Sequence, residues 1–257
     1  MAGGSRTTIF TKRPEPGAVK TRLCPPLTPA EAAELSLAML DDTISKCLGA
    51  RELDVGACVA PMQREASSSG EASDRSASLD SIAWFRARHP SVERVTEQRG
   101  DGLGARLAHH IDDESAHQRL PLVVIGSDAP HVPIERVIEA HAALARGADL
   151  VIGPDVGGGY YLVGLARSVP ELFTRIDMTA ADMGSRTLDL ARELGLDTAL
   201  LAPDYDIDTP RDALRLLAEL RSGARDRRTI PRTSAVLERL SSRFADEPQG
   251  PSLTAVP

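Results

Sequence analysis

The chain has 257 residues, of which 42% are hydrophobic and 26% are charged, and these values are typical of one globular domain with some additional tail. A formal net charge of −7 and an aromatic content of only 3% exclude a general nucleic-acid binder and a platform for stacked bases. No apolar stretch is long enough for a membrane span or a secretory signal, and the three cysteines lack CxxC spacing, so we expect a cytoplasmic protein without a membrane partner.

The N-terminal part predicts a short strand, the apolar and β-branched run 7–10, followed by a basic loop at 12–23. Only three lysines occur in the chain and two of them lie in this loop, whereas nearly every other cation is an arginine. A lysine ammonium acts on phosphate as a compact point charge. We therefore predict a phosphate-binding loop, with a solvated basic surface loop as the alternative. Its candidate residues are Lys12, Arg13, Gly17, Lys20 and Arg22.

Extended and helical patterns alternate through the rest of the chain. The predicted strands are 53–60, 92–98, 120–125, 150–152 and 198–201, and a loop followed by a further strand is predicted within 153–164. The predicted helices are 28–48, one that begins near 105, 133–145, 182–194 and 210–220. Such alternation predicts an α/β fold, with a mostly parallel central sheet between two helical layers in a three-layer α/β/α arrangement.

One domain is predicted at 7–222. It contains an insertion at about 64–80 that is rich in Ser, Gly and charged residues, and we expect this insertion to be flexible and without a chemical role. The remaining residues, 223–257, are rich in Arg, Pro and Ser. For them we expect a mobile tail that holds at most one short helix near 234–243.

Carboxylates follow several of the predicted strands. In open α/β sheets the ligand lies outside the carboxyl ends of the strands, which brings such residues together. Asp128 directly follows a buried strand, Asp155 opens a glycine run after another, and Asp206 and Asp208 share one face of the last extended segment. Carboxylates hold hard cations such as Mg²⁺. The alternative is helix capping by Asp128, and by Asp208 or Thr209.

Two glycine-rich segments, 100–104 and 157–159, predict places where the backbone approaches a base or ribose closely. Neither is the dinucleotide fingerprint, which would open the first helix. No Ser–His–Asp arrangement and no cysteine nucleophile stands out. The further candidates for nucleotide binding are Gly102, Gly104, Arg106, Asp155, Gly158 and Gly159.

In this order, the segments resemble the nucleotide-diphospho-sugar transferase (GT-A-like) superfamily, and most strongly its bacterial family DUF2064, also called rSAM/selenodomain-associated transferase 1. The resemblance covers roughly 7–220 and is carried by 10–23, 102–106, 126–130, 158–165 and 206–210. The chain is also similar to the 2-phospholactate and phosphoenolpyruvate guanylyltransferases. It departs from the DUF2064 pattern at Gly157, where an acidic residue is usual, and at 177–180, where Trp-Ser-Thr is usual.

The resemblance implies that Asp128 and Asp208 hold Mg²⁺ or Mn²⁺, with Asp206 beside them, and that the basic loop binds a triphosphate. It makes 7–222 a nucleotide-binding transferase domain. We expect a Mg²⁺-dependent nucleotidyltransferase that joins an NTP to a small phosphorylated acceptor, with Lys20, Arg22 and Asp128 as its catalytic residues. The alternatives are a glycosyltransferase that uses an NDP-sugar and a nucleotide-binding protein without catalysis. The base, the acceptor and the oligomeric state stay open.

Overall fold

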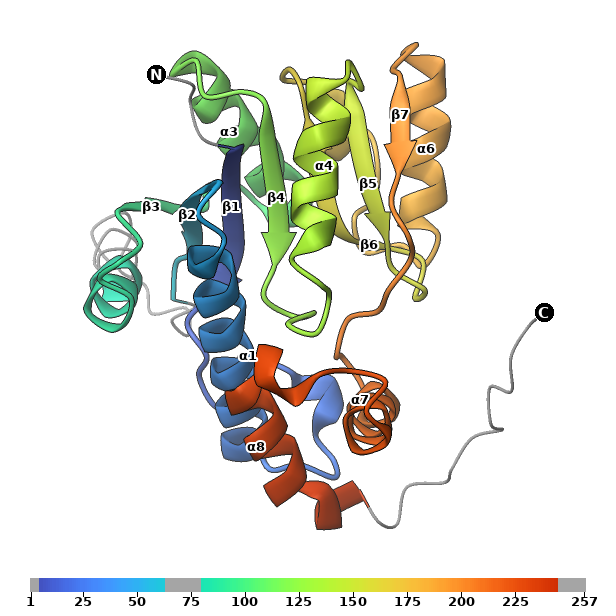
Figure 1. The fold of residues 1–257 in the computed structure, drawn as a ribbon. Coiled ribbons are helices and arrows are strands. Elements are labelled where there is room, and N and C mark those ends of the chain that lie inside the picture. The colour runs from blue at the N-terminus through green and yellow to red at the C-terminus, as the bar shows by residue number, and fades with distance from the viewer. Residues whose placement is uncertain (1–4, 63–79, 245–257) are drawn as a thin grey trace, which may run out of the picture.

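A seven-stranded sheet forms the centre of the protein in the computed structural model, which describes residues 5–62 and 80–244 (Figure 1). The strand order is β3-β2-β1-β4-β6-β5-β7. All pairings are parallel except those of β6, which runs antiparallel to both β4 and β5. The strands are β1 Ser5–Lys12, β2 Leu53–Ala60, β3 Arg94–Glu97, β4 Leu122–Gly126, β5 Leu150–Pro154, β6 Tyr160–Leu165 and β7 Thr198–Leu200.

Helices cover both faces of the sheet, so the predicted three-layer α/β/α fold is confirmed. On one face, apolar side chains of α1, α4 and the helical residues 80–88 pack against the sheet, and on the other those of α3, α5 and α6 do so. No helix of the described chain is long and apolar enough to cross a membrane. The helices are α1 Pro29–Gly49, α3 Gly102–Ala116, α4 Glu135–Ala145, α5 Glu171–Thr174, α6 Met183–Glu193, α7 Pro210–Ser222 and α8 Pro231–Arg239.

Local sequence signals explain where the two helices nearest the site begin. Thr28 caps α1 in a capping box with Glu31, and Thr209 caps α7 in the same way with Asp212. In both helices a proline occupies the first helical position, where its missing N–H costs nothing. These caps fix the ends of the loops that precede α1 and α7.

The C-terminal region differs from the expectation of a mobile tail beginning at 223. Residues 227–244 form the 3₁₀ turn η2 Arg227–Thr229, α8 and the 3₁₀ turn η3 Ser241–Phe244, next to α1 and α7 (Figure 1). Ile230, Leu237 and Phe244 are almost fully buried in a third apolar cluster with α1 and α7. A few apolar residues at helical spacing are thus enough to fold this segment onto α1 and α7, although its overall composition is polar. The predicted insertion at about 64–80 and the segment 245–257 lie essentially outside the described residues.

Candidate nucleotide site

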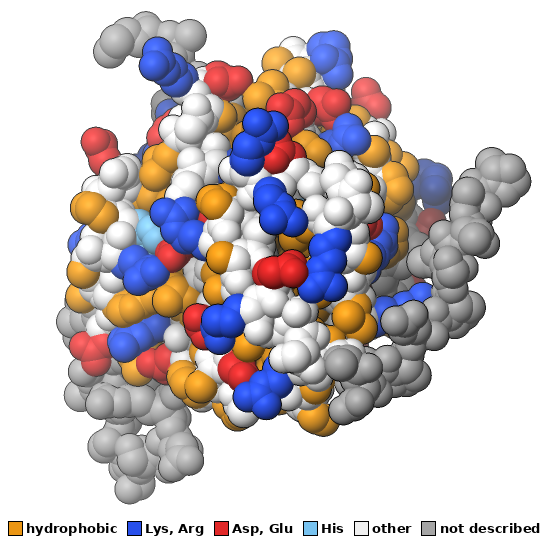
Figure 2. Space-filling view, turned by 60° about the horizontal axis from the view of Figure 1, so that its bottom comes forward, with side chains coloured by type: hydrophobic (Ala, Val, Ile, Leu, Met, Phe, Trp, Pro, Cys, Tyr) orange, Lys and Arg blue, Asp and Glu red, His pale blue; other side chains and the backbone are white. Residues whose placement is uncertain are grey.

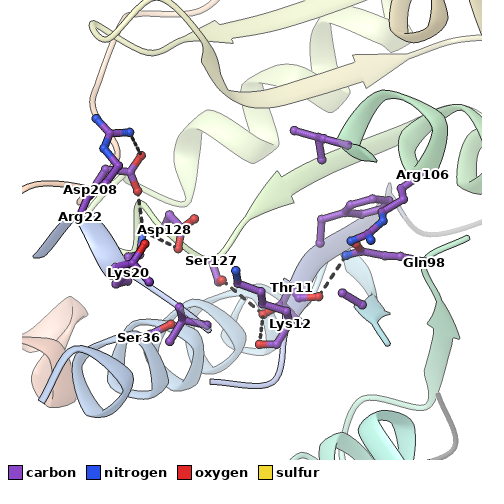
Figure 3. A pocket seen from close by; sticks show the side chains of 15 residues that line it. Thr11, Lys12, Lys20, Arg22, Ser36, Gln98, Arg106, Ser127, Asp128 and Asp208 are labelled. Atoms are coloured by element: carbon purple, nitrogen blue, oxygen red, sulfur yellow. Dashed lines mark hydrogen bonds and ion pairs between the residues drawn. The ribbon is translucent and has the colours of Figure 1, made fainter. Parts of the chain in front are cut away.

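The candidate site lies at the carboxyl edge of the sheet, where the loops after β1 and β4 meet (Figure 3). A cavity of about 290 Å³ opens there. With this edge turned forward, Figure 2 shows basic side chains dispersed around acidic ones. The cavity is lined by six of the residues selected from the sequence: Lys12, Lys20, Arg22, Arg106, Asp128 and Asp208.

Lys20 forms an ion pair with each of the two main metal-ligand candidates, Asp128 and Asp208. Its Nζ lies 2.8 Å from Oδ1 of Asp128 and 2.8 Å from Oδ1 of Asp208 (Figure 3). Burial disfavours the charged amine, but the two carboxylates outweigh burial, and the pKa of Lys20 is raised. Lys20 also has a left-handed backbone with φ 49°, which is uncommon for a residue with a long side chain. One buried ammonium therefore forms ion pairs with two carboxylates.

Neither of these carboxylates serves as a helix cap. The cap of α7 is Thr209, and no side chain caps the N-terminus of α4, the helix that follows Asp128. The carboxylate of Asp208 instead faces Lys20 and Arg22, whose Nη1 lies 3.6 Å from Oδ2 of Asp208. Although burial works in the opposite direction, Lys20 holds the pKa of Asp208 below its ordinary value. Both carboxylates are thus directed toward the cavity.

Asp206 and Asp155 lie beside this ion-pair cluster. Burial raises the pKa of Asp206 to about 8, and the negative charges of Asp128 and Asp155 add to the effect. The carboxylate of Asp155 accepts two backbone hydrogen bonds, from Asp206 N at 3.1 Å and from Gly157 N at 2.8 Å. Asp155 therefore holds a turn and the Asp206 segment in place.

The remaining residues of the basic loop differ in what they contact. Lys12 Nζ donates a hydrogen bond to Ala18 O at 2.7 Å, which closes the loop on itself. Arg13 pairs with Glu15 and lies 5.6 Å from the Trp84 ring centroid, outside the cavity lining. The turn at Gly17 has φ 80°, a conformation that favours glycine. Lys12, Lys20 and Arg22 line the cavity, and Arg13 does not.

Packing within the protein explains two glycines that the sequence suggested for ligand contact. A Cβ on Gly104 would lie 2.2 Å from Phe173 O, and one on Gly158 would lie 1.9 Å from Ala181 O. Both positions need glycine because another segment of the chain approaches them. Neither Gly158 nor Gly159 lines the cavity that contains Lys20.

Sequence reasoning missed Gln98, which lines the same cavity and is 7% exposed. Its Nε2 donates to Thr11 O at 3.0 Å (Figure 3) and to Cys58 O at 2.9 Å, so the orientation of the amide is fixed. Because both amide hydrogens are used, Oε1 is presented on the opposite side as a hydrogen-bond acceptor. Gln98 ends the predicted strand 92–98, so the strand-end rule that selected the aspartates could have found it.

A second cavity, of about 610 Å³, adjoins the first and shares Arg22 and Asp208 with it. Asp155 and Asp206 lie on its wall, and so do Arg211 and Arg215 near the start of α7. The Arg215 guanidinium lies 3.8 Å from the Tyr205 ring centroid and is fixed by Glu219 at 2.9 Å. Two cavities therefore meet at the Arg22–Asp208 pair.

The described side chains include no group of three or more His, Cys, Asp or Glu residues arranged to hold a metal ion. Asp128 and Asp208 nevertheless direct oxygen atoms to one shared cation, the Lys20 ammonium. Mg²⁺ takes oxygen ligands and usually binds through one or two carboxylates together with substrate phosphates and water. The two carboxylates therefore fit a metal that arrives with phosphate ligands better than one held by protein alone.

The protein thus combines a mostly parallel α/β sheet with a basic loop and paired carboxylates at the carboxyl edge of that sheet. The model of the DUF2064 family, described as "uncharacterized protein conserved in bacteria", matches residues 43–180, and the chain belongs to this family. No curated protein matches the chain.

Among solved structures, a candidate nucleotide-diphospho-sugar transferase from Desulfovibrio desulfuricans G20 is 28% identical, with a TM-score of 0.79 over 93% of this chain and 96% of that one. A 4-diphosphocytidyl-2C-methyl-D-erythritol synthase is 11% identical, with a TM-score of 0.51 over 84% of this chain and 98% of that one. A nucleotidyl transferase from Methanothermobacter is 12% identical, with a TM-score of 0.51 over 86% and 100% of the two chains. The last two show a shared fold.

Proposed function

We propose that the protein is a Mg²⁺- or Mn²⁺-dependent nucleotidyltransferase that joins an NTP to a small phosphorylated acceptor and releases pyrophosphate. The observation that carries the proposal is the position of Lys20 between Asp128 and Asp208, of which Asp208 lines both cavities. The likeness to transferase folds supports the same class of reaction.

The nucleotide occupies the first cavity in this proposal. Its base lies near Gln98 and Arg106, where a fixed acceptor and a guanidinium offer hydrogen bonds. The triphosphate lies along Lys12, Lys20 and Arg22, whose charges offset its own. The acceptor occupies the second cavity.

The reaction is an in-line displacement at the α-phosphorus. A phosphate oxygen of the acceptor forms a bond to this phosphorus while the bond to the α–β bridging oxygen breaks, and the electron pair leaves with pyrophosphate. Lys20 and Arg22 stabilise the charge that develops on the leaving group, so positioning and electrostatics do most of the work. A bound metal, held by Asp128 and Asp208 with Asp206 beside them, would polarise the phosphate oxygens.

Titration of NMP, NDP and NTP in the presence of Mg²⁺ tests the proposal on the wild type and on Lys20→Ala. We expect NTP to bind most tightly to the wild type. Lys20→Ala should weaken NTP binding by roughly one to two decades and NMP binding much less, because a charge-assisted contact contributes about 1.5–3 kcal/mol. A wild type that binds none of the three nucleotides would overturn the proposal.

A glycosyltransferase that uses an NDP-sugar is the second candidate. The 28% identical relative, a candidate nucleotide-diphospho-sugar transferase, favours it. In that case NTP should bind no better than NDP, and Lys20→Ala should weaken NDP and NDP-sugar binding instead. The same titration therefore separates the two candidates.

A further inference from the structure

We propose that Lys20 is a built-in counter-ion that competes with the divalent metal, so that the site takes up metal together with a nucleotide and binds free metal poorly. This inference rests on the proposed function and adds the order in which its ligands bind. Lys20 would then occupy two positions: with the carboxylates in the empty site, and with phosphate oxygens in the loaded one.

The first argument is geometric. The Lys20 ammonium is 2.8 Å from one oxygen of Asp128 and 2.8 Å from one oxygen of Asp208, so it occupies the point between them. A metal ion bound by the same two oxygens would lie in contact with this ammonium. At such a distance two positive charges repel strongly in a partly buried site. Metal and ammonium therefore exclude each other from this position.

The second argument concerns the fate of the displaced ammonium. The side chain of Lys20 is 5% exposed, and its only side-chain ion pairs among the described residues are those with Asp128 and Asp208. A metal ion that arrived alone would leave this buried charge without a partner, which is costly. A metal–nucleotide complex supplies phosphate oxygens in the same cavity, so Lys20 exchanges one set of anions for another.

The backbone supports a role specific to this position. Lys20 has left-handed φ and ψ values of 49° and 36° at the entrance of the 3₁₀ turn η1 Thr21–Leu23. Non-glycine residues in this region carry strain that persists only where the surrounding structure compensates for it. The two ion pairs made by the side chain are such a compensation.

Lys12 provides a matched control. It belongs to the same loop and lines the same cavity, but its Nζ bonds to the backbone oxygen of Ala18. Lys12→Met and Lys20→Met thus remove the same charge from the same loop, and only the second frees Asp128 and Asp208. Lys20→Gln is a second variant for the case that the methionine variant does not fold.

Mn²⁺ binding, measured by the EPR signal of the free ion with and without an α,β-methylene NTP analogue, tests the proposal. For the wild type we expect the analogue to tighten Mn²⁺ binding at least about tenfold. Without the analogue, Lys20→Met should bind Mn²⁺ at least about tenfold more tightly than the wild type, and Lys12→Met should stay within about threefold. Adding Asp128→Asn to Lys20→Met should abolish the gain.

Equal affinity of Lys20→Met and wild type for free Mn²⁺ would overturn the counter-ion role. An equal gain in Lys12→Met would also overturn it, because net charge alone would then explain the effect. If Lys20→Met gains Mn²⁺ affinity but no variant binds the analogue, the counter-ion role stands and the proposed nucleotidyl transfer fails. The experiment can therefore contradict the counter-ion role of Lys20 and the proposed nucleotidyl transfer independently of each other.

Discussion

In the candidate site one lysine ammonium contacts two carboxylates, and Arg22 contacts one of the two as well. Lys20 pairs with Asp128 and Asp208, while Asp206 beside them has a pKa raised to about 8 by burial and by neighbouring carboxylates. A divalent metal ion in the place of the Lys20 ammonium would therefore bring more positive charge to this acidic cluster. Removing the charge of any one carboxylate should therefore change the electrostatics of the site.

Asp128→Asn should lower kcat at least roughly 100-fold, since loss of even an indirect metal partner commonly costs 10–100-fold. The amide keeps the shape of the side chain but removes one of the charges that face Lys20. Steady-state kinetics across a Mg²⁺ titration would measure the loss. Asp189→Asn, on the exposed surface of α6, is the control and should remain as active as wild type. Full activity of Asp128→Asn would refute the metal role.

Strand-end reasoning predicted that the candidate residues lie at one edge of the sheet, but it could not give the orientation of each side chain. Lys12, Lys20, Asp128 and Asp208 do line one cavity, as the parallel pattern predicts. The sequence could not show that Lys20 bonds to the two aspartates, because both contacts are remote in sequence and the one with Asp208 joins residues 188 positions apart. Arg13 lies outside the cavity lining and instead contacts Glu15 and the ring of Trp84, and the second of these contacts is remote in sequence.

Among the secondary-structure elements, α8 is the one whose role the polar composition of 223–257 did not predict. It packs on α1 and α7, and its cluster includes Tyr205 and Ile207, which flank Asp206. Arg225, just before η2, forms two hydrogen bonds with Asp204, at 2.7 and 3.0 Å. The C-terminal region thus supports the segment that carries Asp206 and Asp208. Averaged composition hid the apolar spacing that produces this packing.

Leu237→Ala should lower the free energy of unfolding by roughly 2–5 kcal/mol, because Leu237 is fully buried and the change leaves a cavity. Leu200→Ala, at a position that is 58% exposed, should change it by less than about 0.5 kcal/mol. Urea denaturation measures both. If the two variants are equally stable, α8 does not belong to the folded core. Truncation after Gly223 should be more damaging than either substitution.

Over the whole molecule, alternating strands and helices were sufficient to predict the three-layer architecture. The antiparallel insertion of β6 between β4 and β5 was not predicted, since sequence periodicity carries no information on strand direction. Two histidines link the helical layers to strand β1: His110 bonds to Thr8 at 3.1 Å, and His141 bonds to Thr7 at 2.9 Å. They lie in the layers of α3 and α4.

The burial of these two histidines leads to a prediction of how the stability of the protein depends on pH. Burial lowers the pKa of His110 to about 4 and that of His141 to about 4. The unfolded chain takes up their protons near pH 6.5, so between pH 6.5 and 4 the unfolded state binds more protons. The free energy of unfolding should therefore fall as pH falls through this window, by up to roughly 3 kcal/mol per histidine.

Chemical denaturation at several pH values would measure this dependence. His110→Asn should be less stable at pH 7 but should show a shallower decline toward pH 4. Its exposed neighbour His109 is the matched control, and His109→Asn should retain the full decline. Identical pH profiles for His110→Asn and wild type would contradict the assignment of a neutral, buried His110.

The fate of the α-phosphate tests the central claim most directly. The protein is incubated with Mg²⁺, a set of small phosphorylated acceptors and NTPs that carry ³²P in either the α or the γ position. The account predicts that the α label appears in a new acceptor product, that the γ label appears in an equal amount of pyrophosphate, and that both disappear in Asp128→Asn. Transfer from an NDP-sugar with release of NDP, and no transfer of the α label from any NTP, would contradict it.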